Sequence, residues 1–151
     1  MTLMRLGLVA ALAALIAHGS PLAASSYDRQ IHAVIGNLDL TSFPNSVGPR
    51  REPGKTTFAA YGFVDLETID NGASLTREDK GWMMSFTILS AGPSGLRLCF
   101  HDRGLARPGD VIGPSYNTWS ALFVSTARRG LWTARQIPGG FAGCRNDPPD
   151  S

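Results

Sequence analysis

Residues 82–102 constrain the fold most, because apolar and polar side chains alternate on both sides of a central turn. Strand side chains point to opposite faces in turn, so a period of two predicts two antiparallel strands joined at residues 91–95, the segment Ala-Gly-Pro-Ser-Gly. The side chains expected to face the core are Trp82, Met84, Phe86, Ile88, Leu96, Leu98 and Phe100. Arg97, Cys99 and His101 are then expected on the opposite face.

Other segments rich in β-branched and aromatic residues predict further strands at 31–35, 56–65, 116–125 and 131–137, with short ones at 111–112 and 139–144. Residues 65–80 read as a polar connector with a turn at Asp70-Asn71-Gly72. No amphipathic helix is evident after the N-terminal segment. The sequence therefore predicts an all-β fold: a single antiparallel β-sandwich or partly open barrel of about seven short strands with one disulfide.

The N-terminal residues have the order of a secretory signal. Arg5 precedes an uninterrupted apolar run at residues 7–17, and small residues follow at 23–26. This run is too short to span a bilayer, which needs about 20 residues. We expect residues 1–24 to be a signal peptide cleaved after Ala24, and the protein to be exported to the periplasm or outside the cell, with no membrane span.

Residues 25–151 are then close to the usual size of one domain. This single β domain contains a Pro/Gly-rich loop at 44–55 and a frayed C-terminal tail at 145–151. Removing Arg5 from 14 basic residues leaves a net charge near +1 against 12 acidic residues. A nearly neutral domain does not suggest a nucleic-acid partner, which a basic patch would mark.

Cys99 and Cys144 are the two cysteines of the chain, and export places them in an oxidising compartment. We therefore expect them to form a disulfide. No paired Cys/His ligands accompany them, so no zinc site is predicted. Oxygen-bearing side chains gather at residues 65–71, but their order departs from that of a calcium loop. A solvated turn explains them, and no metal or cofactor is predicted.

Candidate catalytic groups are few. His101 with Asp102, or His101 with His32, could in principle act as a general acid/base pair. Adjacent strand residues point to opposite faces, however, so Asp102 does not orient its neighbour, and nothing in the spacing brings His32 close. No nucleophile motif such as G-x-S-x-G is present. Whether the protein is an enzyme is left open, and these observations favour a protein without catalytic activity.

Candidate binding residues lie in loops and on aromatic positions. Two loop tips are basic, at Arg50-Arg51 and at Arg128-Arg129. Two aromatic residues, Tyr116 and Trp132, could stack on a sugar ring or anchor a protein partner. Trp82 and Trp119 are expected in the core.

Long loops on a small, oxidised β scaffold favour recognition over catalysis. The leading hypothesis is an exported binding module for a protein or glycan in the cell envelope or outside the cell, a class that includes inhibitors of hydrolases. The alternative is a small secreted hydrolase that uses a histidine as general acid/base.

Overall fold

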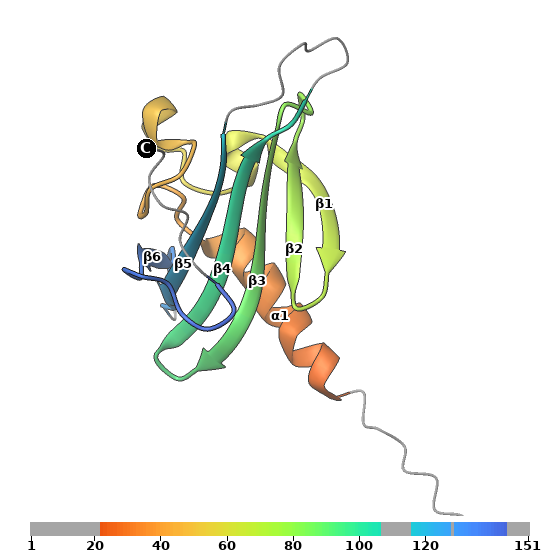
Figure 1. The fold of residues 1–151 in the computed structure, drawn as a ribbon, viewed down its shortest axis with the longest axis vertical. Coiled ribbons are helices and arrows are strands. Elements are labelled where there is room, and N and C mark those ends of the chain that lie inside the picture. The colour runs from red at the N-terminus through yellow and green to blue at the C-terminus, as the bar shows by residue number, and fades with distance from the viewer. Residues whose placement is uncertain (1–21, 107–115, 128, 145–151) are drawn as a thin grey trace, which may run out of the picture.

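The computed structural model describes residues 22–106, 116–127 and 129–144, with side chains from Tyr27 onward. One helix is followed by a meander in which each strand pairs antiparallel with the next, in the order β1 to β6 (Figure 1). The elements are α1 (Leu22–Asn37), the short 3₁₀ helices η1 (Gly48–Arg50) and η2 (Ala59–Tyr61), and the strands β1 (Phe63–Ile69), β2 (Gly72–Arg77), β3 (Trp82–Gly92), β4 (Gly95–Gly104), β5 (Asn117–Ser125) and β6 (Thr133–Gln136).

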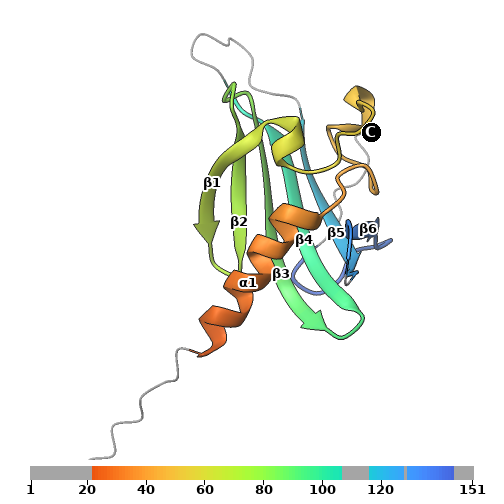
Figure 2. The same cartoon turned by 180° about the vertical axis from the view of Figure 1, so that it is seen from behind.

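The protein is mostly β, but the predicted sandwich or barrel is wrong. The described residues form one open six-stranded sheet, and α1 together with the segment after it covers one face of that sheet (Figure 2). The helix and the loops up to η2 thus take the place of a second sheet. Hydrophobic residues from the helix and this segment share one core with the strands, among them Ile31, Val34, Leu38, Phe43 and Phe58.

Residues 31–35, predicted as a strand, are helical. Ile31, Val34 and Leu38 are buried, and Tyr27 packs against the same core. This spacing of three and four residues is that of one helix face. The prediction failed because Tyr27 was left out of the segment considered, and a window of five residues is too short to show the helical period.

Residues 65–80, predicted as a connector, contain most of β1 and all of β2. Ala73 and Leu75 are buried in the core, while β1 is exposed along most of its length because it is an edge strand. The charged residues of β1 led to the incorrect prediction of a connector there. The predicted turn at Asp70-Asn71-Gly72 is confirmed: Asn71 has a φ of 54°, and Gly72 lies so close to β3 that a Cβ would be 1.9 Å from the carbonyl oxygen of Phe86.

The central hairpin is confirmed as β3 and β4. Its apolar side chains face α1, and all are at most 4% exposed except Trp82, which is half-buried: Met84, Phe86, Ile88, Leu96, Leu98 and Phe100. Phe86 and Phe100 are cross-strand partners, and Phe100 packs edge-on against Phe43 at 5.1 Å between ring centroids. The hairpin therefore supplies the centre of the core.

The predicted disulfide between Cys99 and Cys144 is confirmed. It attaches the segment after β6 to the face of the sheet opposite α1, where Leu89, Ile137 and Phe141 pack around it in a small second cluster. This arm covers only part of that face (Figure 1). We call the face opposite α1 the open face.

Residues 1–21 lie outside the described part, so the signal peptide remains a prediction. The expected cleavage after Ala24 would remove only the first turn of α1, and the packed positions from Tyr27 onward would stay. Within the described ranges, no helix has the length and apolar character needed to cross a membrane.

Candidate functional site

The open face carries a row of side chains that runs across five strands. The strand register places Glu67, Ser74, Ser85, His101 and Trp119 directly beside one another, from β1 to β5. Neighbouring strands lie about 4.8 Å apart, so this row is about 19 Å long. A second row next to it contains Asp65, Thr76, Met83, Arg103 and Asn117. The open face is thus a broad, mainly polar surface.

Trp119 is the largest exposed ring on this surface. Its side chain is 41% exposed, and its ring lies parallel to that of His101 with the ring centroids 3.9 Å apart. His101 Nε2 lies 2.6 Å from Asn117 Oδ1, and because an amide oxygen only accepts, the imidazole N–H donates. Asn117 thus holds the imidazole by a hydrogen bond, and the imidazole supports one face of the indole.

The prediction that Trp119 fills the core is wrong. On β5, Leu122 and Val124 are fully buried against α1, so the alternation of the strand turns Trp119 to the open face. That alternation was visible in the sequence, and it is the signal that would have found this residue. Asn117 and Ser85 were not singled out, because only the strand pairing brings them to His101.

The candidate catalytic residues do not come together. His101 is on the open face, whereas Asp102 is 1% exposed on the α1 side of the sheet, as the alternation predicted. His32 is exposed on α1, so the sheet separates it from His101. The described residues therefore hold neither the His101–Asp102 pair nor the His32–His101 pair.

Asp102 instead joins the segment after α1 to the sheet. Its Oδ2 accepts from the backbone N–H of Ser46 at 2.7 Å, and its Oδ1 accepts from Ser46 Oγ at 2.9 Å and from Trp82 Nε1 at 2.6 Å. Burial raises the pKa of this carboxyl above its ordinary value, and the hydrogen bonds from Ser46 and Trp82 oppose that rise only in part. The network explains why an acidic residue is tolerated in this position.

We expect Asp102→Asn to destabilise the protein by about 1–3 kcal/mol, because either amide orientation turns its NH₂ toward a donor of Ser46 or Trp82. A carboxyl with a raised folded-state pKa binds its proton more tightly in the folded protein. Its contribution to stability is therefore present at low pH and falls as pH rises through the folded-state pKa. In urea melts, the free energy of unfolding of the variant should fall further below that of the native protein near pH 4 than near pH 7.

Ser46→Ala is the matched control for this prediction, since it removes one of the three donors and keeps the carboxyl. It should lower stability while retaining the pH dependence. A deficit of Asp102→Asn that grows as pH rises would mean that the folded protein favours the ionised carboxylate, contrary to the raised pKa.

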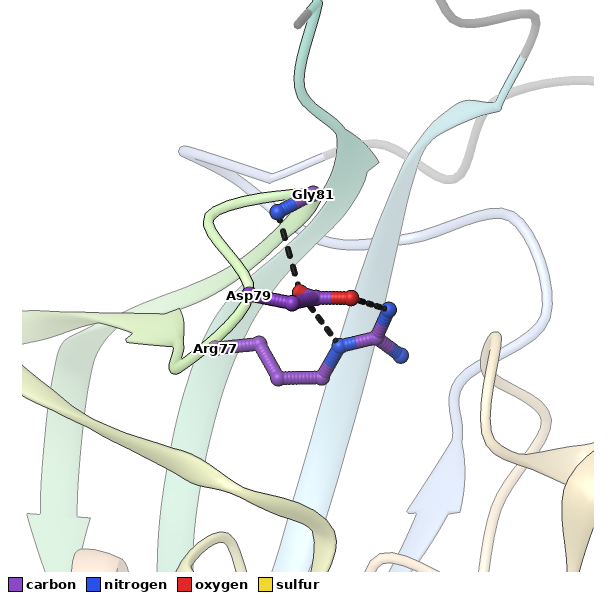
Figure 3. A network of polar contacts seen from close by, with 3 residues as sticks. All are labelled: Arg77, Asp79 and Gly81. Atoms are coloured by element: carbon purple, nitrogen blue, oxygen red, sulfur yellow. Dashed lines mark hydrogen bonds and ion pairs between the residues drawn. The ribbon is translucent and has the colours of Figure 1, made fainter.

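A concave region lies on the α1 side, between the loop around η1 and the turn after β2. We call it the loop cleft. Its inner recess is lined by Ser46, Val47, Arg50, Tyr61, Phe63, Arg77 and Trp82. Asp79 holds Arg77 through two hydrogen bonds, and the same carboxylate accepts from the backbone N–H of Gly81 at 3.0 Å, as Figure 3 shows. The turn thereby fixes the guanidinium at the rim.

The loop cleft is less suited to a large ligand than the open face. Its recess has a volume of about 30 Å³, far below that of a ligand pocket, and only the outer part, with about 450 Å³, has room for a ligand of that kind. In the wider outer part, Glu52 pairs with Lys55 and Arg77 with Asp79, so these charges already neutralise each other. The ion pairs leave little net charge for recognition.

The predicted binding residues are scattered. Arg50 lines the loop cleft, and Arg51 is exposed beside it. Tyr116 packs on Trp82 at 5.4 Å between centroids, and Trp132 is half-buried against the core, with its Nε1 donating to the carbonyl oxygen of Ala127. Arg129 is exposed in the turn between β5 and β6, and Arg128 lies outside the described residues.

The acidic side chains at the β1–β2 end do not form a cation site in the structure. Asp65 makes an ion pair with Lys80. In the ranges that the structure describes, no three His, Cys, Asp or Glu side chains are grouped so that they could hold a metal.

Fold and site together define a small protein in which a helix supports an antiparallel meander and a partly aromatic face of the sheet is left open. No protein-family model, curated protein or solved structure matches the chain.

Proposed function

We propose that this protein is an exported binding module that holds a glycan on its open face. The observation that carries the proposal is the Trp119 stack, an exposed indole held against His101 on the open face. Aromatic side chains contribute large contact areas at low cost in conformational entropy, and a ring already held by its neighbours loses even less on binding. His101 supports one face of this ring, and Asn117 holds His101.

The surroundings of Trp119 fit the polar part of a sugar. In the second row, Asn117 is exposed and Thr76 is half-buried, and their side chains both donate and accept, whereas Ser74 and Ser85 of the first row are buried. A sugar ring has an apolar C–H surface and a rim of hydroxyl groups. One aromatic platform with short polar side chains beside it complements both features.

Export is part of this proposal. It is supported by the N-terminal sequence pattern and by the disulfide between Cys99 and Cys144, since disulfides persist in oxidising compartments. An exported protein would encounter glycans of the envelope or of the cell exterior.

Trp119→Ala tests the proposal. We expect it to weaken binding of the oligosaccharide that the native protein prefers by about tenfold or more, which corresponds to about 1.4 kcal/mol. Binding is measured by isothermal titration calorimetry against neutral oligosaccharides (cello- and chito-oligosaccharides) and an acidic one (oligogalacturonate). Leu131→Ala is the matched control, because Leu131 is also 41% exposed but lies in the turn before β6. Equal losses in both variants would contradict the proposal.

A second candidate is a hydrolase that uses His101 as general base. One observation favours it: Ser85 is the cross-strand partner of His101, and Asn117 orients the imidazole, an order of side chains seen in nucleophile–base–orienter sites. However, His101 is only 9% exposed beneath Trp119, and the described hydrogen bonds include none between Ser85 and His101. Cleavage of the titrated oligosaccharides that is lost in His101→Ala would favour this candidate.

A further inference from the structure

We infer that the glycan is anionic and that arginines of β4 and β6 bind its carboxylates. This inference rests on the proposed function and specifies its ligand class. The residues that carry it are Arg97 and Arg103 on β4 and Arg135 on β6, all exposed on the open face around Trp119.

The near-neutral net charge of the chain hides a separation of charges. From β4 to residue 144, the described residues contain four arginines, at positions 97, 103, 129 and 135, and a single acidic residue, Asp102. Asp102 is buried on the α1 side and does not face them. The acidic side chains of the open face, Asp65 and Glu67, lie on β1 at the far edge, and Asp65 is paired with Lys80. The half of the open face over β4–β6 is therefore basic.

These arginines lie along a line beside the aromatic rings. Arg97 and Arg103 share one face of β4 and are six residues apart, which corresponds to about 20 Å. Trp119 and His101 lie between them in the register. Arg97, Phe123 and Arg135 are neighbours across β4, β5 and β6. Cys99 and Ala121 lie between Trp119 and the row of Arg97 and Arg135, and both are covered by the disulfide arm. A chain that crosses Trp119 along the strands would therefore reach Arg103 directly, and Arg97 and Arg135 by passing over this arm.

Stacking holds two of the guanidinium groups in place. Arg135 lies over the ring of Phe123 at 5.2 Å, and Arg97 over the ring of Phe141 at 5.8 Å. A guanidinium stacked on a ring keeps its N–H groups at the edge, where they can donate in pairs to a carboxylate. Arg103 donates weakly to Met83 Sδ at 3.6 Å, which leaves most of its five donors for a ligand.

A polyuronate, a sugar chain with carboxylates at regular intervals, matches this combination of one stacking platform and spaced guanidinium groups. Single-stranded nucleic acid is also anionic, but its binding surfaces stack successive bases on several exposed rings. Here Trp119 is the one aromatic ring on the described open face that is exposed rather than half-buried. The observations therefore favour the acidic glycan.

The experiment compares oligogalacturonate, a neutral cello-oligosaccharide of the same length and an oligothymidylate by isothermal titration calorimetry at two salt concentrations. The variants are Arg103→Gln, Arg135→Gln and, as the control, Arg51→Gln, which removes an exposed arginine beside the loop cleft. We expect oligogalacturonate to bind best. Arg103→Gln and Arg135→Gln should each weaken it by roughly tenfold and reduce its salt dependence. Arg51→Gln should leave binding unchanged.

The outcomes separate the two proposals. Binding of the neutral oligosaccharide through Trp119, with no effect of the arginine variants, would overturn the anionic ligand and leave the glycan module standing. Preference for oligothymidylate would overturn both, and so would binding of none of the three probes together with no binding of chito-oligosaccharides. Thermal melts of the variants should match the native protein, because these arginines are exposed.

Discussion

Replacing Phe86 by alanine is expected to destabilise the folded protein by about 3–5 kcal/mol. The side chain is 1% exposed, faces Phe100 across the hairpin and packs against Phe58 at 6.3 Å between centroids. Its removal forfeits the transfer free energy of a buried ring and leaves a cavity that the surrounding strands can close only in part. This loss is a large share of a total stability of about 5–15 kcal/mol. Urea melts of the oxidised protein measure it.

Thr87→Ala is the matched control for Phe86→Ala, since the adjacent residue lies on the open face opposite Cys99 and is half-buried. It should cost less than about 1 kcal/mol. A slip of the strand register by one residue would exchange the two faces, so a larger loss at Thr87 than at Phe86 would contradict the arrangement of β3 described here.

Removing the disulfide is expected to cost about 4 kcal/mol. The bridge between Cys99 and Cys144 joins positions 45 residues apart, and the unfolded chain gains the entropy of that loop when the bridge is absent. The double variant Cys99→Ala/Cys144→Ala should show this loss in urea melts. Hydrogen exchange should increase in the arm after β6, because the bridge and the small cluster around it attach this arm to β4.

The native protein melted in the presence of a reductant provides the control, and it should lose about as much stability as the double variant. If the double variant unfolds within about 1 kcal/mol of the oxidised native protein, the bridge does not restrain the unfolded chain as the loop-entropy argument requires.

The features predicted correctly from the sequence are those that depend on residues close together in the chain. The period of two along residues 82–102 identified the hairpin and its buried face, since the alternation of side chains is a property of each strand. The turns at Asp70-Asn71-Gly72 and at residues 91–95 contain the residue types that such turns require. The chain contains two cysteines, so one disulfide was the single possible pairing within it, and the structure contains that disulfide.

Three elements were mistaken because local patterns were ambiguous. Residues 56–65 were predicted as a strand, but the 3₁₀ helix η2 occupies their middle and β1 begins only at Phe63. The residues from Ile31 to Ile35 are compatible with a strand in isolation, and only the contacts of Tyr27, Ile31, Val34 and Leu38 with one core show the helix. Likewise, the charged residues of β1 are acceptable in an edge strand with exposed side chains, but the sequence does not say which strand will be at the edge.

The candidate site depended on pairing between strands. His101 and Trp119 are 18 positions apart and meet because β4 and β5 pair in one register; the same register places Arg97 next to Phe123 and Arg135. It also put Asp102 on the other face, where Ser46 and Trp82 bind it. The sequence by itself determined the hairpin, the turns and the disulfide, because these follow from local periodicity and chemistry. The tertiary structure alone decided which face is covered by α1, and so which aromatic and basic side chains remain together on the open face.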